Sequence, residues 1–328
     1  LLRWSRMHST SFGTSGTRVS AVGLGLAALG RPGYLTLGHG EDLVGRTEVP
    51  ALERHVHRML DAARAAGINY FDGARSYGRS EEFLASWLRT RGVASDEVVV
   101  GSKWGYIYRA DWRTDAEVHE VKLHSRENLE RQYTESTGWL GAHLRLYQIH
   151  SATAESGVLE DRAVMSRLAE LRDAGVIVGV TVSGPGQADT IRRALTIAPG
   201  GTPLFGAVQA TWNLLETSAG QALSEAADAG LAVIVKEAVA NGRLTSRNPS
   251  IADRLGGPGS DWPVDALAIA AVLRQPWATI VLSGAATEEQ LASNLRALDV
   301  SADVVDGLPV LSEPAEQYWA TRSSQIWT

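Results

Sequence analysis

Short, strongly apolar runs recur along the chain from about residue 20 to its end, and helical patterns separate them. The runs in the middle of the chain are rich in valine, isoleucine and leucine and lack alternating polar positions, which is typical of parallel strands buried on both faces. The pattern predicts eight strands, at Ala21–Leu26, Asn69–Phe71, Val98–Ser102, Leu144–Ile149, Val176–Val182, Phe205–Ala210, Ala232–Val235 and Thr279–Leu282.

The segments between these runs carry apolar residues at helical spacing. Within Ala51–Ala66, the residues Val56, Met59, Leu60 and Ala63 lie on one face of a helix. The same period predicts helices at Glu81–Thr90, Arg162–Ala174 and Thr287–Leu298. Eight alternations of strand and helix favour the α/β class and a closed parallel (β/α)8 barrel, or TIM barrel, over an open doubly wound sheet.

Long irregular segments follow three of the predicted strands, at Ala27–Pro50, Tyr106–Glu120 and Ala240–Trp262. In a barrel the loops after strands form the active-site face, so we expect long loops at the C-terminal face. We hypothesise that the first loop overhangs the pocket. Because an α/β barrel with insertions exceeds about 250 residues, we interpret residues 1–328 as a single domain with an N-terminal extension and hairpin at 1–18.

Composition argues against several other classes of protein. A net charge of −6 argues against binding to the phosphates of nucleic acid. The chain has no cysteine, which excludes disulfides, thiolate metal sites and cysteine nucleophiles. No apolar stretch reaches the roughly 18 residues that a membrane span needs, and residues 1–18 lack the apolar region of a secretory signal. We therefore expect a cytoplasmic protein with no membrane partner; no pattern specifies its oligomeric state.

Four polar or ionisable residues lie at or just after the ends of three successive predicted strands. Asp72 follows the second strand and Tyr77 stands five positions later, while Lys103 and His150 follow the next two strands. Taken singly, each is better explained as a cap, a packing residue, a surface charge or a structural histidine. Taken together, they are expected to meet at one mouth of the barrel, where catalytic residues lie. A lysine at the end of a buried strand also needs a partner, and Asp72 is the obvious one.

The segment around Asp72 and Tyr77 carries a more specific pattern. The sequence GINYFDGARSYG at residues 67–78, followed by Ser80 and Glu81, resembles the signature of the aldo-keto reductase family. The contexts of Lys103 and His150 are similar to that family's other two catalytic positions. The resemblance implies a barrel enzyme that uses NADP(H) or NAD(H) to reduce an aldehyde or ketone to an alcohol, or runs the reverse oxidation. It implies the catalytic tetrad Asp72, Tyr77, Lys103 and His150.

These residue types suit carbonyl reduction. A nicotinamide supplies the hydride, because no side chain can. A tyrosine with a pKa near 10 is a poor acid at neutral pH unless its phenolate is stabilised. We expect Lys103 to hydrogen-bond Tyr77 and provide that stabilisation, with Asp72 holding Lys103 in place. His150 would hydrogen-bond the substrate oxygen and orient the carbonyl.

The same resemblance implies residues that bind the cofactor. Ser183 is similar to the serine that binds the nicotinamide carboxamide, and Gln209 matches a second ligand whose amide can both donate and accept. The segment from Gly284 to Asn294 resembles the one that holds the adenosine end. The implied cofactor residues are Ser183, Gln209, Lys236, Ala238, Asn241, Gly242, Gly284, Ala286, Gln290 and Asn294.

Two positions near the nicotinamide depart from the family pattern. Gly184 stands where the family often has asparagine, and Lys236 stands where an aromatic ring usually stacks on the nicotinamide. A cation beside that ring would favour the reduced, neutral nicotinamide over the positively charged oxidised form. Alternatively, Lys236 turns away to Glu237 or to a phosphate.

A third departure concerns the 2′-phosphate of NADPH. Gln290 stands where NADPH-dependent members of the family carry an arginine, and an amide cannot form the charged bidentate pair of a guanidinium. We therefore expect weak discrimination between NADPH and NADH. The alternative is that Arg243 or Arg296 reaches the phosphate from elsewhere.

For the substrate, a small carbonyl compound or alcohol, we expect a pocket lined by Tyr34, Trp104 and Trp212, since both tryptophans follow strand ends.

Two alternative functions are possible on the same barrel scaffold. A non-catalytic, cofactor-binding regulatory or channel-associated subunit would not need the complete tetrad. A metal-dependent barrel hydrolase would need several ligands at strand ends, where only Asp72 and His150 are candidates, so we predict no metal.

Overall fold

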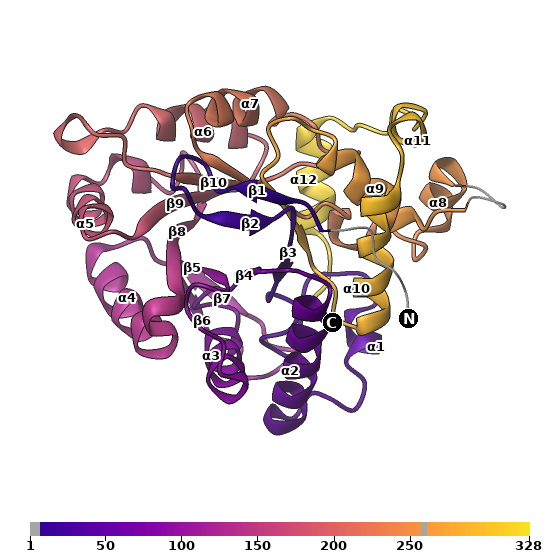
Figure 1. Cartoon of the computed structure of the whole chain (residues 1–328), viewed down its shortest axis with the longest axis horizontal. Coiled ribbons are helices and arrows are strands. Elements are labelled where there is room, and N and C mark those ends of the chain that lie inside the picture. The colour runs from indigo at the N-terminus through magenta and orange to yellow at the C-terminus, as the bar shows by residue number, and fades with distance from the viewer. Residues whose placement is uncertain (1–6, 257–260) are drawn as a thin grey trace.

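The computed structural model describes residues 7–256 and 261–328. Its centre is a closed barrel of eight parallel strands in the order β10-β11-β12-β3-β4-β5-β8-β9 (Figure 1). The strands are β3 (Val22–Gly25), β4 (Tyr70–Asp72), β5 (Val99–Trp104), β8 (Leu144–Ala152), β9 (Ile177–Val182), β10 (Ala207–Thr211), β11 (Ala232–Lys236) and β12 (Ile280–Ser283). This topology confirms the predicted (β/α)8 barrel.

Burial on both faces explains why the strands lack polar alternation. Every residue of β4, β5 and β10 is buried. One face of each strand points into the barrel, and the other packs against the surrounding helices. The few polar residues inside the strands, such as Gln148 and Gln209, are therefore exceptions that need hydrogen-bond partners.

Helices connect the strands and form the outer layer of the molecule (Figure 1). Residues at their first turns fix where some of these helices begin. At the start of α5, the Asp161 side chain accepts hydrogen bonds from the backbone of Ala163 and Val164. At the start of α2, Pro50 occupies the first turn. These helices are α2 (Val49–Ala65), α3 (Ser80–Arg91), α4 (Arg126–Leu140), α5 (Arg162–Asp173), α6 (Gln187–Leu195), α7 (Gly220–Asp228), α9 (Val264–Leu273) and α10 (Glu288–Leu295).

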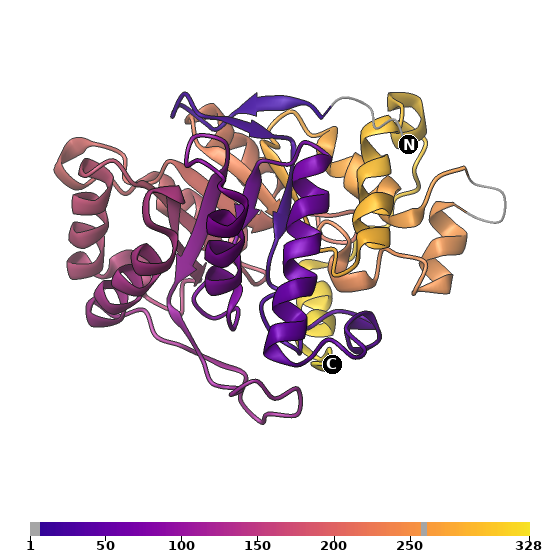
Figure 2. The same ribbon diagram turned by 60° about the horizontal axis from the view of Figure 1, so that its bottom comes forward.

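An antiparallel hairpin of β1 (Ser9–Ser11) and β2 (Arg18–Ser20) covers the amino-terminal end of the barrel (Figure 2). Phe12 and Val19 are buried there, in one cluster with barrel residues such as Tyr70, whose ring lies 6.0 Å from that of Phe12. This apolar plug leaves the opposite end of the barrel for the site.

The segments expected to be irregular contain short elements. Ala27–Pro50 includes α1 (His39–Asp42), and Ala240–Trp262 includes α8 (Pro249–Leu255), with residues 257–260 outside the described part. Tyr106–Glu120 begins with β6 (Tyr106–Tyr108) and ends where β7 (Glu120–Lys122) starts, and these two strands pair as a hairpin. Elements of three to seven residues are too short to show a hydrophobic period, which is why the sequence did not predict them.

At its carboxyl-terminal end the barrel carries the β6–β7 hairpin, and the C-terminus lies at the same end after α11 (Ala302–Asp306) and α12 (Ala315–Ser323) (Figure 2). No helix in the described ranges combines the length and apolar character needed to cross a membrane.

Candidate active site

The four residues of the predicted tetrad meet at the carboxyl end of the barrel. Asp72 ends β4, Lys103 lies in β5, His150 lies in β8, and Tyr77 lies between β4 and α3. The Lys103 ammonium donates to the Asp72 carboxylate and, at 3.0 Å, to the carbonyl of Gly73. The Tyr77 hydroxyl lies 3.4 Å from Nε2 of His150. Asp72 and Lys103 are buried, with exposures of 2% and 1%.

Two glycines hold the turn that carries Tyr77 against the loop after β3. A β-carbon on Gly30 would lie 2.1 Å from the carbonyl oxygen of Tyr77, and one on Gly78 would lie 2.4 Å from the carbonyl oxygen of Gly30. The backbone of Arg79 donates to Gly30 across this contact at 2.7 Å. Only glycine permits so close an approach, and Gly78 also has a φ of 56°. The contact fixes the position of the Tyr77 side chain.

Three uncharged donors saturate the other oxygen of the Asp72 carboxylate. Tyr70, Gln148 and Gln209 donate to Oδ1 at 3.2, 3.3 and 3.2 Å. A buried carboxylate needs such partners. Tyr70 and Gln148 were not predicted to be parts of the site. Each stands two positions before a tetrad residue, so strand alternation turns it to the same face, and that spacing was the available signal.

The protonation of Tyr77 differs from the expectation. Burial, together with the charge of Asp72, raises the pKa of Tyr77 well above its ordinary value. No hydrogen bond joins Lys103 to the Tyr77 hydroxyl; instead the Lys103 nitrogen lies 4.9 Å from the centre of the Tyr77 ring. We expected a hydrogen bond from Lys103 to stabilise the Tyr77 phenolate. That expectation was wrong, because the ammonium is directed at Asp72 and Gly73.

His150 is neutral at ordinary pH. Burial lowers the pKa of His150 well below its usual value, and the positive charges of Lys103, Lys236 and Arg31 act in the same direction. A neutral imidazole has one donor and one acceptor nitrogen, so its partners decide which is which. Ser76 Oγ lies 3.4 Å from Nδ1, on the side of the ring away from Tyr77.

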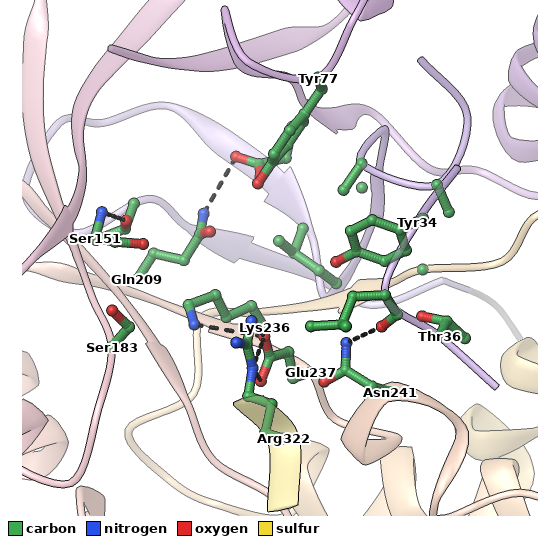
Figure 3. Close-up of a pocket in the computed structure, with 18 of the residues that line it drawn as sticks. Tyr34, Thr36, Tyr77, Ser151, Ser183, Gln209, Lys236, Glu237, Asn241 and Arg322 are labelled. Carbon is green, nitrogen blue, oxygen red and sulfur yellow. Dashed lines mark hydrogen bonds and ion pairs between the residues drawn. The ribbon is translucent and has the colours of Figure 1, made fainter. Parts of the chain in front are cut away.

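Asp72, Tyr77 and His150 line a cavity of about 420 Å³ (Figure 3). Of the predicted pocket and cofactor residues, those on this cavity are Tyr34, Ser183, Gln209, Lys236, Ala238, Asn241 and Gly284. The volume is in the range of about 300–1,000 Å³ that is usual for small-molecule sites. The structure therefore brings most of the predicted residues to one place.

Four predicted cofactor residues lie outside this cavity. Gly242 ends the turn Ala240–Gly242 with a φ of 90°. Ala286 donates its backbone N–H to Gln290 Oε1 at 2.8 Å. Asn294 accepts from Ser283 at 2.7 Å and donates to Asp265 at 2.6 Å. The last three shape the connection between β12 and α10.

The two tryptophans predicted for the substrate pocket do not line it. Trp104 is fully buried in the core, with its ring 5.7 Å from that of His124. Trp212 packs 5.6 Å from Trp277 and lines a separate groove. Residues next to each other along a strand point to opposite faces. Since Lys103 points into the barrel, Trp104 faces the helices. The alternation of side chains along the strand could have predicted this placement from the sequence.

Two half-buried ion pairs on the cavity wall were not predicted. Arg31 donates to Glu120 at 3.0 Å and to the carbonyl of Ser76 at 2.9 Å. Arg322 of α12 donates from Nε to both carboxylate oxygens of Glu237, at 2.9 and 3.0 Å. Each pair joins residues more than 80 positions apart in the sequence, so no local motif could predict it.

The C-terminal residues close one side of the cavity. The ring of Trp327 stacks on His119 at 4.2 Å, and the Arg31 guanidinium lies 4.5 Å from its centre. Thr328 and Tyr34 exchange backbone hydrogen bonds of 3.1 and 3.3 Å. The wall that faces Tyr77 is thus aromatic and built from three separate segments.

The cavity fits a nicotinamide dinucleotide in its polar groups. The Ser183 hydroxyl faces it and makes no side-chain hydrogen bond within the described chain. Among the residues that the structure describes, the buried Oδ1 of Asn241 has no hydrogen-bond partner, and a β-carbon on Gly284 would meet nothing within 4 Å. These open groups are of the kind that a bound amide, ribose or phosphate would satisfy. Within the described residues, no group of three or more histidine and acidic side chains could hold a metal ion.

A comparison with models of known protein families shows which family the chain belongs to. The model of the "Aldo/keto reductase family" matches residues 36–257, which is more than half of the sequence and includes the four tetrad positions. The chain belongs to the aldo-keto reductase family. Aldo-keto reductases generally bind nicotinamide cofactors.

Individual relatives of this aldo-keto reductase are distant. "Aldo-keto reductase str7" of Strobilurus tenacellus is 34% identical over 90 residues, covering 26% of this chain and 23% of that protein. The "Probable voltage-gated potassium channel subunit beta" of Oryza sativa subsp. japonica is 32% identical over 103 residues, covering 30% of this chain and 26% of that protein. The chain thus matches about a quarter of the length of these curated relatives.

Among solved structures, the aldo-keto reductase of Bacillus halodurans in its holo form is similar with a TM-score of 0.70. The identity is 20%, and the match covers 94% of this chain and 97% of that one. At this identity the likeness concerns the fold.

Proposed function

We propose that this aldo-keto reductase reduces an aldehyde or ketone to an alcohol with NADPH or NADH, and catalyses the reverse oxidation. The observation that carries the proposal is the pairing of Tyr77 and His150 in the cavity. The Tyr77 hydroxyl and Nε2 of His150 lie 3.4 Å apart and both face the open space. One carbonyl oxygen placed between them can accept a hydrogen bond from each.

Tyr77 is the proton donor in this proposal. Its raised pKa keeps the hydroxyl protonated at neutral pH. The proposed role of His150 requires the tautomer in which Nδ1 accepts from Ser76, 3.4 Å away, so that the ring proton lies on Nε2 and faces the substrate oxygen. As the proton leaves Tyr77, negative charge develops on its oxygen, and the Lys103 ammonium beside the ring stabilises it. Asp72 holds Lys103 in place through that transfer.

A bound nicotinamide would supply the hydride that reduces the carbonyl carbon. Ser183 and the free carbonyl of the Gln209 amide would hold its carboxamide, since the Gln209 nitrogen is already bound to Asp72. Asn241 and Gly284 would face the ribose and phosphates. Ser183 and Gln209 would thereby orient the ring toward Tyr77 and His150.

Weak discrimination between NADPH and NADH belongs to the same proposal. The Gln290 oxygen is bound to the backbone of Ala286. Arg296 donates to the carbonyl of Asp261 at 2.6 Å, and Arg243 pairs with Glu313. Each arginine therefore already has a partner within the described chain. Losing one charge-assisted hydrogen bond costs about 1.5–3 kcal/mol, which is about 10- to 150-fold in affinity.

A second candidate is a cofactor-binding subunit without turnover, which the similarity to the rice channel subunit favours. The complete tetrad favours the enzyme. The discriminating experiment measures binding and turnover of NADPH and NADH with aldoses, aromatic aldehydes and ketosteroids. We expect turnover with both cofactors and a ratio of kcat/KM below about a thousandfold. Cofactor binding without turnover of any carbonyl would support the second candidate, and no binding would contradict both.

A further inference from the structure

Lys236 reaches into the cavity from the end of β11. Its ammonium donates to the hydroxyl of Thr211 on β10 at 2.8 Å, and its side chain is 16% exposed. Figure 3 shows it extending from the Glu237–Arg322 pair toward the side of the cavity where Ser183 and Gln209 lie. It therefore lies beside the groups that are proposed to hold the nicotinamide.

Lys236 carries a positive charge that no carboxylate on the cavity wall is free to cancel. The acidic residues described on this wall each have another cation as their nearest partner: Asp72 has Lys103, Glu120 has Arg31, and Glu237 has Arg322. Lys236 lies 3.9 Å from Glu237, whose two oxygens both accept from Arg322 at 2.9 and 3.0 Å. Together with Lys103, which is buried beside Asp72 but does not itself line the cavity, these groups comprise four cations and three carboxylates, so one positive charge is in excess.

The backbone and α12 keep Glu237 with Arg322. Glu237 has a φ of 57°, a left-handed conformation that a non-glycine residue keeps only where its surroundings impose it. The carboxylate turns to Arg322. The pKa of Glu237 falls to about 2 because the nearby cations, Arg322 first, outweigh the opposing effect of burial, so the pair stays ionised. Lys236 therefore cannot draw this carboxylate away.

The charge on Lys236 depends on pH in an accessible range. Burial lowers the pKa of Lys236 to about 8; Arg322 and Lys103 also lower it, whereas Glu237 and Asp72 raise it. The ring of Trp319 lies 5.6 Å from the ammonium, and His150 across the cavity is neutral. Lys236 is thus charged at neutral pH and uncharged at alkaline pH.

Hydride transfer to a carbonyl held by Tyr77 and His150 requires the nicotinamide ring to lie in this same cavity. The ring is neutral when reduced and positively charged when oxidised. We propose that the ammonium of Lys236 makes the cavity discriminate between the two redox states, so that it binds the reduced cofactor more tightly than the oxidised one. This inference rests on the proposed function. It adds a favoured direction for the reaction, carbonyl reduction, because the oxidised cofactor would then dissociate readily after each reduction.

The experiment measures dissociation constants of NADPH and NADP⁺ by fluorescence, without a carbonyl substrate. The ratio of the two constants, oxidised over reduced, should fall about tenfold in Lys236→Met, because like charges that share a buried cavity repel each other strongly. It should stay near the wild-type value in Lys236→Arg. The chain has three lysines, and Lys122→Met, outside the cavity, is the matched control and should also retain the ratio.

Wild-type protein provides a second test that needs no variant. The ratio should fall as the pH rises from about 7 to about 9, on either side of the Lys236 pKa of about 8. If Lys236→Met weakened the binding of both cofactor forms equally, the ammonium would lie on a phosphate and the inference would be overturned. A ratio of dissociation constants that changes neither in the variant nor with pH would also overturn it. Failure of wild-type protein to bind either form would instead contradict the proposed function, and the inference with it.

Discussion

In the proposed mechanism Tyr77 donates the proton, and two of its properties bear on that role. Its hydroxyl is strongly held in the protonated form by burial and by Asp72, yet its ring lies against the Lys103 ammonium at 4.9 Å. The first property keeps the proton available at neutral pH. The second stabilises the oxygen only once negative charge develops on it, so Lys103 acts during the transfer and not before.

Removing this hydroxyl tests the assignment. Tyr77→Phe should keep cofactor binding and lose about 10²- to 10⁴-fold in kcat, because general acid catalysis is typically worth that much. Tyr108→Phe, in the same region but off the cavity, should stay within a few-fold of wild type. Single-turnover kinetics with an aromatic aldehyde would measure both. Near-normal turnover by Tyr77→Phe would remove Tyr77 from the mechanism.

At the scale of elements, the loop after β3 has two parts with different contacts. Residues 27–36 supply cavity-lining side chains, including Arg31 and Tyr34. The following part is tied to the connection after β11: Leu37 donates to the carbonyl of Asn241 at 3.1 Å, and Arg247 pairs with Asp42. The first part therefore covers the site while the second anchors it.

This division predicts which part of the loop affects substrate choice. Replacing residues 32–36 with a glycine–serine segment of equal length should change the order of kcat/KM among aldehydes by about tenfold or more, while cofactor affinity changes less. The same replacement at residues 115–117, which do not line the cavity, is the control. An unchanged substrate profile in the first variant would count against a role for this loop in specificity.

For the whole molecule, the buried histidines link stability to pH. Burial lowers the pKa of His39 and His124 to about 4, and that of His150 well below its usual value. The unfolded chain binds these protons near pH 6.5, whereas the folded chain resists them. Their contribution to stability is thus complete above the unfolded pKa and decreases as the pH falls below it.

Urea unfolding at several pH values would measure this linkage. We expect the free energy of unfolding to fall by about 1–2 kcal/mol for each of these histidines between pH values of about 6.5 and 5. His39→Leu should lose part of this dependence, since the Nε2 of His39 is buried and has no hydrogen-bond partner in residues 7–256 and 261–328. A stability independent of pH across this range would show that the folded protein accepts the protons.

The barrel and the convergence of the tetrad at one mouth could be predicted from the pattern of apolar and polar positions. Solid apolar runs record burial on both faces of a strand, and in a closed parallel barrel all strand ends meet at one mouth. Asp72, Lys103 and His150 therefore had to converge, whatever the details of packing.

Only the tertiary structure decided the electrostatics of the site. The partners of Arg31 and Glu237 lie more than 80 positions away in the chain, and the charge left on Lys236 follows from those distant pairings. The rise in the pKa of Tyr77 likewise comes from burial by several segments. Local periodicity specifies which face of an element is buried, whereas charge pairing depends on which distant elements that face meets, so it emerges only when the whole barrel has closed.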